Sequence, residues 1–403
     1  MRAGAMAGPR RLAAPRPWRA GSRNPGPQPS PSPIRPHNAR YRQRFGEEAC
    51  MNTVQLALAL LSLMGAAQGP VKVAMQEEPK GPEPQRAVER LLAGQFRWTY
   101  GPPLVAPVER PEDPCFSVKD PSIVFYQGRW HLFCTIRSRK RTHQIEYLSF
   151  ADWKDAHRAP RHVLQNHKGF FCAPQVFYFV PHKRWYLICQ ASDERWQPKY
   201  GAAYCTSSEI DRPQSWSPLK PLGAKPAQGR AGLDFWIICD QTKAHLFFTT
   251  LDGRLWREET RLEDFPTGWS EPQLAIQGDI FEASHTYRLR GLDKYLTLVE
   301  AQGGHGWRYY KAYLADRLEG PWQPLAATRD HAFASMANVR PAARHWTDSI
   351  SHGELLRAGF DQQLEVNPAR LRFLFQGVTD RARAGKPYGE IPWRLGLLEP
   401  AGP

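Results

Sequence analysis

Five segments of the chain share one pattern of polar and apolar positions. In each, a polar residue precedes a short run rich in Val, Ile, Phe, Tyr and Trp, which leads through turn residues to a second apolar run. Such paired runs predict β-hairpins. The five segments begin at Asp120, Gln175, Asp234, Glu282 and His352.

The spacing of these hairpins predicts a repeated β-sheet unit. After each hairpin there is room for one or two further strands, such as "GRLWREET" after the third. Four strands in each of five units are typical of a β-propeller, whose blades surround a central channel. A β-sandwich is the competing architecture, but it does not predict a repeat of this length. We therefore expect an all-β, five-bladed β-propeller over residues 96–400. A helical pattern, "EPQRAVERLLAG", lies before it in a predicted linker, 68–95.

The polar residues that lead the five hairpins predict a pocket. In a propeller, the innermost strand of each blade begins at one mouth of the channel, so the five leading side chains should converge there. Polar residues at these positions can also simply cap strand edges. Burying a carboxylate without a partner costs several kcal/mol, however, and three of the five leading residues are acidic. This repetition favours a ring around a cavity.

Three carboxylates in one channel suit two kinds of chemistry. Glycosidic bond cleavage needs one protonated carboxyl group for the leaving oxygen and one ionised carboxylate for water. A third carboxylate can raise the pKa of the acid through like-charge repulsion. Asp, Glu and His together also form cation sites, and spacing alone does not separate the two interpretations.

Longer motifs connect this pattern with a known family. The stretches "KDPSIVFYQGRWHLF", "DFWIICD", "FEASHTY", "DSISHGELLRAGFDQQLEV" and "IPWRLGLL" follow one another along the chain. From about Phe96 to Leu398 the sequence resembles the family 62 α-L-arabinofuranosidases, five-bladed propeller enzymes related to the family 43 glycosidases. The resemblance implies removal of α-L-arabinofuranosyl side chains from arabinoxylan, and from arabinan, with inversion at the anomeric carbon.

The resemblance also implies roles for individual residues. Asp120 in "KDP" would be the general base, and Glu282 in "FEAS" the general acid. Asp234 in "DFW" would tune the pKa of the acid and position the sugar. The implied arabinose contacts are Lys119, Gln175, Arg308 and Tyr388.

A metal site and a departure from the family pattern complete this comparison. His352 in "SHGE" matches an axial histidine that helps to hold a structural Ca²⁺ ion, largely through waters, with no cofactor needed for the chemistry. The family commonly has "QWG" after the second hairpin, whereas here Gln190–Ser192 reads "QAS". An aromatic wall is therefore missing, or Trp196 replaces it from a longer loop.

The charge distribution argues against nucleic-acid binding. The formal net charge is +15, but residues 1–50 alone hold ten Arg and two Glu. The remainder has no dense basic helix or basic motif. Residues 1–50 are predicted to be a disordered basic extension ahead of a true start at Met51. We expect a polysaccharide as the partner, no nucleic acid, and a monomer.

The stretch 51–67 predicts a secretory signal peptide. Its apolar part, Val54–Met64, is too short to span a bilayer comfortably, and small residues follow it. A membrane anchor and a transit peptide are the alternatives. We expect a secreted, extracellular protein without stable membrane association. Six cysteines follow Met51, and they could form disulfides or remain buried thiols.

Other functions remain compatible with the same pattern. A family 43-like β-xylosidase or arabinanase would use the same fold and similar carboxylates. A non-catalytic sugar-binding propeller would be expected to lack at least one carboxylate, and here all three are present.

Overall fold

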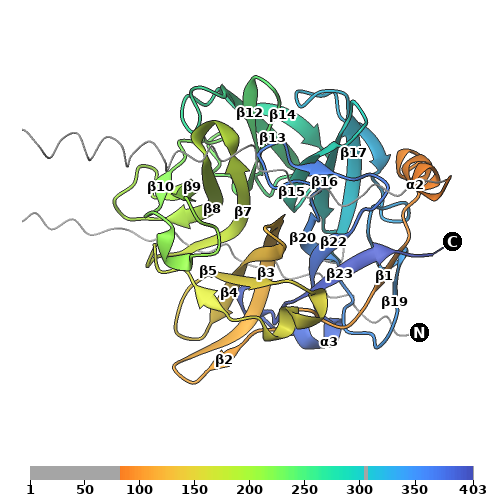
Figure 1. The fold of residues 1–403 in the computed structure, drawn as a ribbon, viewed down its shortest axis with the longest axis horizontal. Helices are drawn as coiled ribbons and strands as arrows, with labels where there is room; N and C mark the ends of the chain where they lie inside the picture. The colour runs from red at the N-terminus through yellow and green to blue at the C-terminus, as the bar shows by residue number, and fades with distance from the viewer. Residues whose placement is uncertain (1–81, 304–306, 403) are drawn as a thin grey trace, which may run out of the picture. The chain divides into compact units, whose positions relative to one another are not determined.

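Five mainly antiparallel sheets follow one another around a ring in chain order (Figure 1). The computed structural model describes residues 82–303 and 307–402. The five-bladed, all-β propeller predicted from the repeats is therefore confirmed. The predictions for 1–50 and 51–67 lie outside the described residues, so the extension, the signal peptide and secretion stay predictions.

The first three blades consist of consecutive strands. Blade 1 contains β2 (Glu109–Arg110), β3 (Asp113–Tyr126), β4 (Arg129–Ser138), β5 (Gln144–Phe150) and β6 (His162–Val163). Blade 2 contains β7 (Phe171–Phe179), β8 (Arg184–Ser192), β9 (Tyr200–Ser207) and β10 (Lys220–Pro221). Blade 3 contains β11 (Leu233–Cys239), β12 (Lys243–Thr249), β13 (Arg254–Arg261) and β14 (Gln273–Gln277).

The last two blades include strands from distant parts of the chain. Blade 4 contains β15 (Glu282–Leu289), β16 (Tyr295–Ala301), β17 (Tyr309–Ala315), β18 (Gln323–Ala326) and β21 (Glu365–Val366). Blade 5 contains β20 (Ser351–Leu355), β22 (Phe373–Gly377), β23 (Arg394–Pro400), β1 (Trp98–Tyr100) and β19 (Val339–Pro341). The fifth predicted hairpin thus differs from the others, because β21 lies between β20 and β22 in the chain and pairs in parallel with β15.

The ring is closed by pairing the two ends of the domain. Strand β1 lies antiparallel to the last strand, β23, and parallel to β19. Trp98 in β1 is 3 % exposed, and its indole N–H donates to the carbonyl of Phe333 at 2.6 Å. Blade 5 is therefore complete only when β1 joins the strands from the end of the chain.

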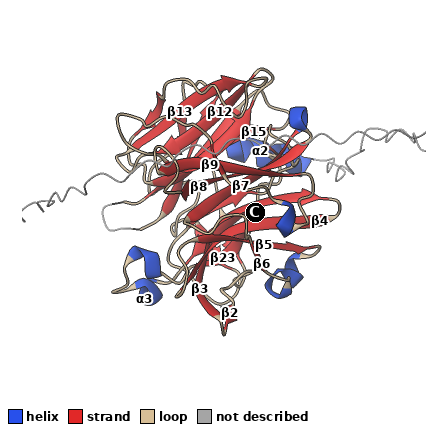
Figure 2. Ribbon diagram, turned by 90° about the vertical axis from the view of Figure 1, so that its left-hand side faces the viewer, coloured by secondary structure: helices blue, strands red, loops and turns tan. Residues whose placement is uncertain are grey.

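Helices are few in this part of the chain (Figure 2). The predicted helical pattern forms α2 (Pro82–Leu92), and Leu91 of this helix is buried in the main hydrophobic cluster. The described end of the predicted linker thus packs against the blades. Helix α3 (Asp380–Arg383) is one turn long. Among the described residues, no helix has the length and apolar character needed to cross a membrane.

The cysteines of the described chain form no disulfide. They are all buried thiols in or beside the blades, and they are Cys115, Cys134, Cys172, Cys189, Cys205 and Cys239. Of the two states that the sequence left open, the structure has the reduced one.

Candidate functional site

Each innermost strand is interrupted by a β-bulge at an equivalent height. The register shifts occur in β3, β7, β11, β15 and β20. Four bulge residues, Asp120, Ala173, Asp234 and Ala283, have φ between 49° and 52°. The left-handed region is unfavourable for residues with a Cβ, so the surrounding structure must hold these residues in place. His352 occupies the fifth bulge.

The bulges are held by hydrogen bonds from blade to blade. In four of the five blades, the N–H of the bulge residue donates to a side chain on the second strand of the preceding blade. The bonds are Asp120 N–H to Gln376 Oε1 (2.8 Å), Ala173 N–H to Thr135 Oγ1 (2.9 Å), Asp234 N–H to Gln190 Oε1 (2.9 Å) and His352 N–H to Glu300 Oε2 (2.8 Å).

Blade 4 departs from this scheme in an informative way. The N–H of Ala283 donates to Asp234 Oδ2 at 2.9 Å. The side chain expected from the repeat is Thr249, whose buried hydroxyl has no hydrogen-bond partner. The carboxylate of Asp234 therefore accepts the N–H of this bulge in place of the neutral Thr249 hydroxyl. We call such an acceptor the cap of the bulge, and this bond fixes the orientation of the Asp234 carboxylate between blades 3 and 4.

Around the bulges, charged groups form one connected network. His352 Nδ1 lies 3.3 Å from Asp120 Oδ1 and 3.7 Å from Asp234 Oδ2. Lys119 Nζ lies 3.2 Å from Asp120 Oδ2 and 5.5 Å from the centre of the Tyr388 ring. Two of the predicted carboxylates thus share one histidine at the axis.

The third carboxylate lies on the far side of this network. The hydroxyl of Tyr388 donates to Glu282 Oε1 at 2.7 Å, and Arg308 Nη1 donates to the same oxygen at 3.1 Å. The Arg308 guanidinium lies 3.8 Å above the ring of Phe281 and 5.5 Å from that of Tyr388. Such stacking over aromatic rings stabilises the cation.

Most of this network is shielded from water. Asp120, Asp234 and Glu282 are between 3 % and 7 % exposed, whereas Tyr388 is 44 % exposed. The site is a buried cluster of charged groups, with the aromatic residue Tyr388 at its solvent side. Paired and hydrogen-bonded charges of this kind make up for a large part of the cost of burial.

Comparison with known proteins matches the same span of chain. Residues 97–399 match the family model described as glycosyl hydrolase family 62. The chain belongs to this family. It is 39 % identical over 316 residues to α-L-arabinofuranosidase C of Cellvibrio japonicus, which covers 76 % of this chain but 47 % of that protein. The chain therefore spans about half the length of this curated relative.

Solved family 62 structures share the fold. The catalytic domain of a Coprinopsis cinerea α-L-arabinofuranosidase has 36 % identity and a TM-score of 0.71, over 76 % of this chain and 98 % of its own. A Podospora anserina α-L-arabinofuranosidase in complex with cellotriose has 37 % identity and a TM-score of 0.70, over the same shares.

The environment of this family 62 site separates the carboxyl groups by pKa. Burial alone would raise the pKa of Asp120, but the charges of Lys119 and His352 outweigh it and hold the pKa below its usual value. Burial raises the pKa of Asp234 well above its usual value, and the charges of Glu282 and Asp120 add to the effect. One site thus favours an ionised and a protonated carboxyl group.

The five leading residues of the hairpins are not all equivalent in space. Asp120, Asp234 and His352 occupy bulges, as a common ring requires. Glu282 precedes its bulge, in the position that Lys119 has in blade 1. The prediction that all five leading side chains converge is therefore wrong for Gln175, because a bulge shifts the strand register by one residue.

Gln175 is the leading residue that joins no carboxylate. It lies two positions beyond the bulge residue Ala173, and its amide bonds the backbone of Ile237 at both ends, at 2.6 and 2.7 Å. The structure therefore gives it a bridging role between blades 2 and 3. A sequence signal for the true position existed, since Pro121 and Pro174 both directly follow a bulge residue.

Sequence reasoning missed the supporting residues. Glu300 is fully buried, and its carboxylate bonds Arg308 Nη1 at 2.9 Å and the Ser351 hydroxyl at 2.8 Å. Burial raises the pKa of Glu300 to about 7, although Arg308 opposes this. Gln376 caps Asp120 and donates to Ser351 at 3.0 Å. The only sequence signal for Glu300 and Gln376 was that each is a polar residue near the end of an apolar strand, the second strand of its blade.

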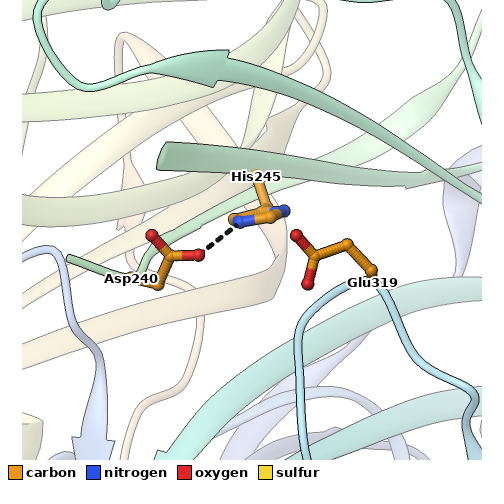
Figure 3. A group of neighbouring side chains, drawn as sticks. All are labelled: Asp240, His245 and Glu319. Atoms are coloured by element: carbon orange, nitrogen blue, oxygen red, sulfur yellow. Dashed lines mark hydrogen bonds and ion pairs between the residues drawn. The ribbon is translucent and has the colours of Figure 1, made fainter. Parts of the chain in front are cut away.

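A separate group of two carboxylates and one histidine lies between blades 3 and 4. Asp240, His245 and Glu319 come close enough together to suggest a metal site (Figure 3). Arg257 Nη1 donates to His245 Nδ1 at 2.8 Å, so Nε2 carries the proton and donates to Asp240 Oδ2 at 2.9 Å. Neither ring nitrogen then has a free lone pair, and the group is a hydrogen-bonded ion network.

Proposed function

We propose that the protein is an inverting α-L-arabinofuranosidase that removes terminal α-L-arabinofuranosyl side chains from arabinoxylan, and also from arabinan. The observation that carries the proposal is the meeting of Asp120, Asp234 and Glu282 in one buried cluster. Glycoside hydrolysis requires such a group of carboxyls with different protonation states. The names of the family 62 relatives support the choice of sugar.

In the proposed reaction, Asp120 is the general base. Its lowered pKa keeps it ionised, so it can take a proton from the water that attacks the anomeric carbon. Glu282 is the general acid and gives its proton to the glycosidic oxygen as the bond to the sugar breaks. The two residues come from blades 1 and 4, and inversion requires their carboxyl groups to lie about 6.5–9.5 Å apart with a water molecule between them.

Asp234 supports this exchange from blade 3. Its raised pKa favours a proton on Asp234, opposite the ionised Asp120. Lys119, Arg308 and Tyr388 supply donors around the same space and are proposed to orient the sugar hydroxyls. Arg308 and Tyr388 also hold the Glu282 carboxyl group in place.

The axial residues also suit the proposed Ca²⁺ ion. His352 lies between Asp120 and Asp234, so it would help to hold the ion largely through waters, with carboxylate oxygen atoms of the kind that Ca²⁺ prefers nearby. When bound, the ion would offset the negative charge of the carboxylates and brace the channel. The acid and base steps use protein side chains alone.

Product analysis tests this proposal against its alternatives. We expect the purified protein to release free arabinose from wheat arabinoxylan and branched arabinan, with the β-anomer as the first product by NMR. A family 43-like β-xylosidase would release xylose, and an arabinanase would release oligosaccharides. Appearance of the α-anomer first would refute inversion.

Two substitutions test the catalytic roles. Asp120→Asn and Glu282→Gln keep the size of the side chain but remove the base and the acid. Each should lower kcat by about 10²–10⁴-fold on arabinoxylan, because general acid–base catalysis contributes that much. Thermal unfolding should show that both variants remain folded, and normal turnover by either variant would contradict its assigned role.

A further inference from the structure

The loop in which this chain departs from the family pattern ends at a tyrosine. The loop, residues 193–199, follows the "QAS" motif at the end of β8, and β9 begins directly after it with Tyr200. Tyr200 pairs with Ser192, the last residue of the motif. The position of the Tyr200 side chain is therefore set by the sheet of blade 2.

The pairing of β8 and β9 directs this side chain towards blade 3. Side chains alternate between the two faces of a sheet, and paired residues share a face. Two positions along each strand from the Tyr200–Ser192 pair, Ala202 pairs with Gln190, so these four side chains lie on one face. On this face, Gln190 Oε1 accepts the N–H of Asp234 at 2.9 Å. The face that carries Tyr200 thus meets the strand that carries Asp234.

Cys172 on the inner strand β7 brings blade 2 to the level of the carboxylates. It pairs with Gln190 and directly precedes the bulge residue Ala173. Lys119 and Glu282 hold the corresponding positions in blades 1 and 4. Blade 2 therefore presents a buried thiol where these two blades present charged groups of the site.

The hydroxyl group of Tyr200 lies near the carboxylates and is available to a ligand. Burial raises the pKa of the Tyr200 phenol far above its ordinary value, and the nearby Cys172, Asp234 and Glu282 raise it further. Among the described residues, none forms a hydrogen bond with this hydroxyl, and its oxygen is not fully buried. A phenol group both donates and accepts hydrogen bonds, so it can bind a hydroxyl group of a sugar.

We propose that Tyr200 is a further substrate-binding residue, whose hydroxyl forms a hydrogen bond with a hydroxyl group of the arabinosyl unit. The inference rests on the proposed function, since it concerns the sugar that the carboxylates would cleave. Binding sites for neutral ligands are typically lined by aromatic side chains with a few polar groups that fix the orientation of the ligand. Tyr200 supplies both from blade 2.

The other aromatic residue of the same loop lies on the opposite face of the sheet. Trp196 stacks on His167 with an interplanar angle of 18° and packs against the hydrophobic cluster of blades 1 and 2. Ala191 is fully buried in that cluster. The inference therefore assigns the aromatic contribution of this loop to Tyr200, in place of the expected Trp196.

Tyr200→Phe tests the inference because it removes the hydroxyl alone. We expect kcat/KM to fall about five- to tenfold on both wheat arabinoxylan and 4-nitrophenyl α-L-arabinofuranoside, mostly through KM, since both substrates contain the arabinosyl unit. The urea midpoint should stay unchanged, because the lost hydroxyl has no described protein partner. Tyr204→Phe is the matched control, on the same face of β9 with its ring stacked 5.8 Å from that of Tyr186, and it should change neither quantity.

The outcomes are separable. An unchanged kcat/KM for Tyr200→Phe, or an equal fall for Tyr204→Phe, would overturn the inference. A fall confined to arabinoxylan would also overturn it, because the contact would then be with the main chain. A wild-type protein inactive on both substrates would refute the proposed function. Calorimetric titration with methyl α-L-arabinofuranoside then still tests the residue: weaker binding by Tyr200→Phe supports its role, and equal affinities or no binding by the wild type overturn it.

Discussion

At the scale of single residues, Asp234 combines two requirements that oppose each other. Its carboxylate accepts the N–H of Ala283, which fixes its place, yet it is buried beside Asp120 and Glu282. Every other described bulge is capped by a side chain from the second strand of the preceding blade. A charged group at this position favours chemistry at the cost of stability, as is common at active sites.

The charge of Asp234 should therefore be visible in the pH dependence of stability. Its pKa is raised in the folded state, so its contribution to stability is present below the unfolded pKa and is lost as pH rises through the folded pKa. Asp234→Asn keeps an acceptor for Ala283 and should raise the free energy of unfolding at pH 8 by about 1–2 kcal/mol. The gain should shrink towards pH 4.

Urea denaturation at the two pH values measures this difference, and activity on arabinoxylan should fall in the same variant. An equal loss of stability at both pH values would show that the amide cannot replace the carboxylate as a cap. It would contradict the electrostatic explanation.

At the scale of elements, the repeated unit is a bulged strand together with its cap. The bulge turns one side chain of each inner strand towards the axis, and the cap comes from a neighbouring blade. The residue that supplies the cap can lie far along the sequence from the bulge residue that it holds, as Gln376 does from Asp120. The position of Asp120, the proposed general base, thus depends on the neighbouring sheet as well as on its own strand.

Two buried glutamines provide a matched test of this device. Gln376→Leu leaves the N–H of Asp120 without a partner, whereas Gln175→Leu removes bonds to Ile237 away from the bulge. Each should cost about 1–3 kcal/mol of unfolding free energy. Only Gln376→Leu should also lower kcat, by about tenfold, because it displaces Asp120, the proposed base.

Steady-state kinetics at a temperature where both variants are folded separates these effects. A normal kcat for Gln376→Leu would show that the cap does not position Asp120. A raised KM for Gln175→Leu would instead support the sugar contact that the family resemblance implies for this residue.

At the scale of the whole propeller, the site exists only when the ring is closed. The inner strands that carry the site belong to all five sheets, and blade 5 needs β1 for completion. Trp98 anchors β1, since it is buried against Phe96 and Phe333. Closure therefore links the stability of the start of the domain to the geometry of the channel.

Removal of this anchor should weaken the entire domain. Trp98→Ala should lower the free energy of unfolding by about 3–5 kcal/mol, as for other buried tryptophans. Leu274→Ala, which truncates an exposed side chain, should change it by less than about 0.5 kcal/mol. Urea denaturation measures both, and similar values for the two variants would exclude a closing role for Trp98.

The sequence by itself determined the architecture and the chemical groups. Apolar runs with a polar leading residue recur because each blade repeats the same exposure pattern, and acidic residues at the head of buried strands mark a pocket, as Asp120 and Asp234 do. Tertiary structure alone decided which side chains stand in register and what holds them. An inserted bulge residue shifts by one position which side chains of a strand face the axis. In blade 2 the bulge position is therefore occupied by Ala173, and Gln175 bonds the backbone of Ile237 instead of joining the ring of bulge residues. The partners of the site, such as Glu300 and Gln376, are joined to it by hydrogen bonds between blades, and no local pattern of residues encodes such contacts.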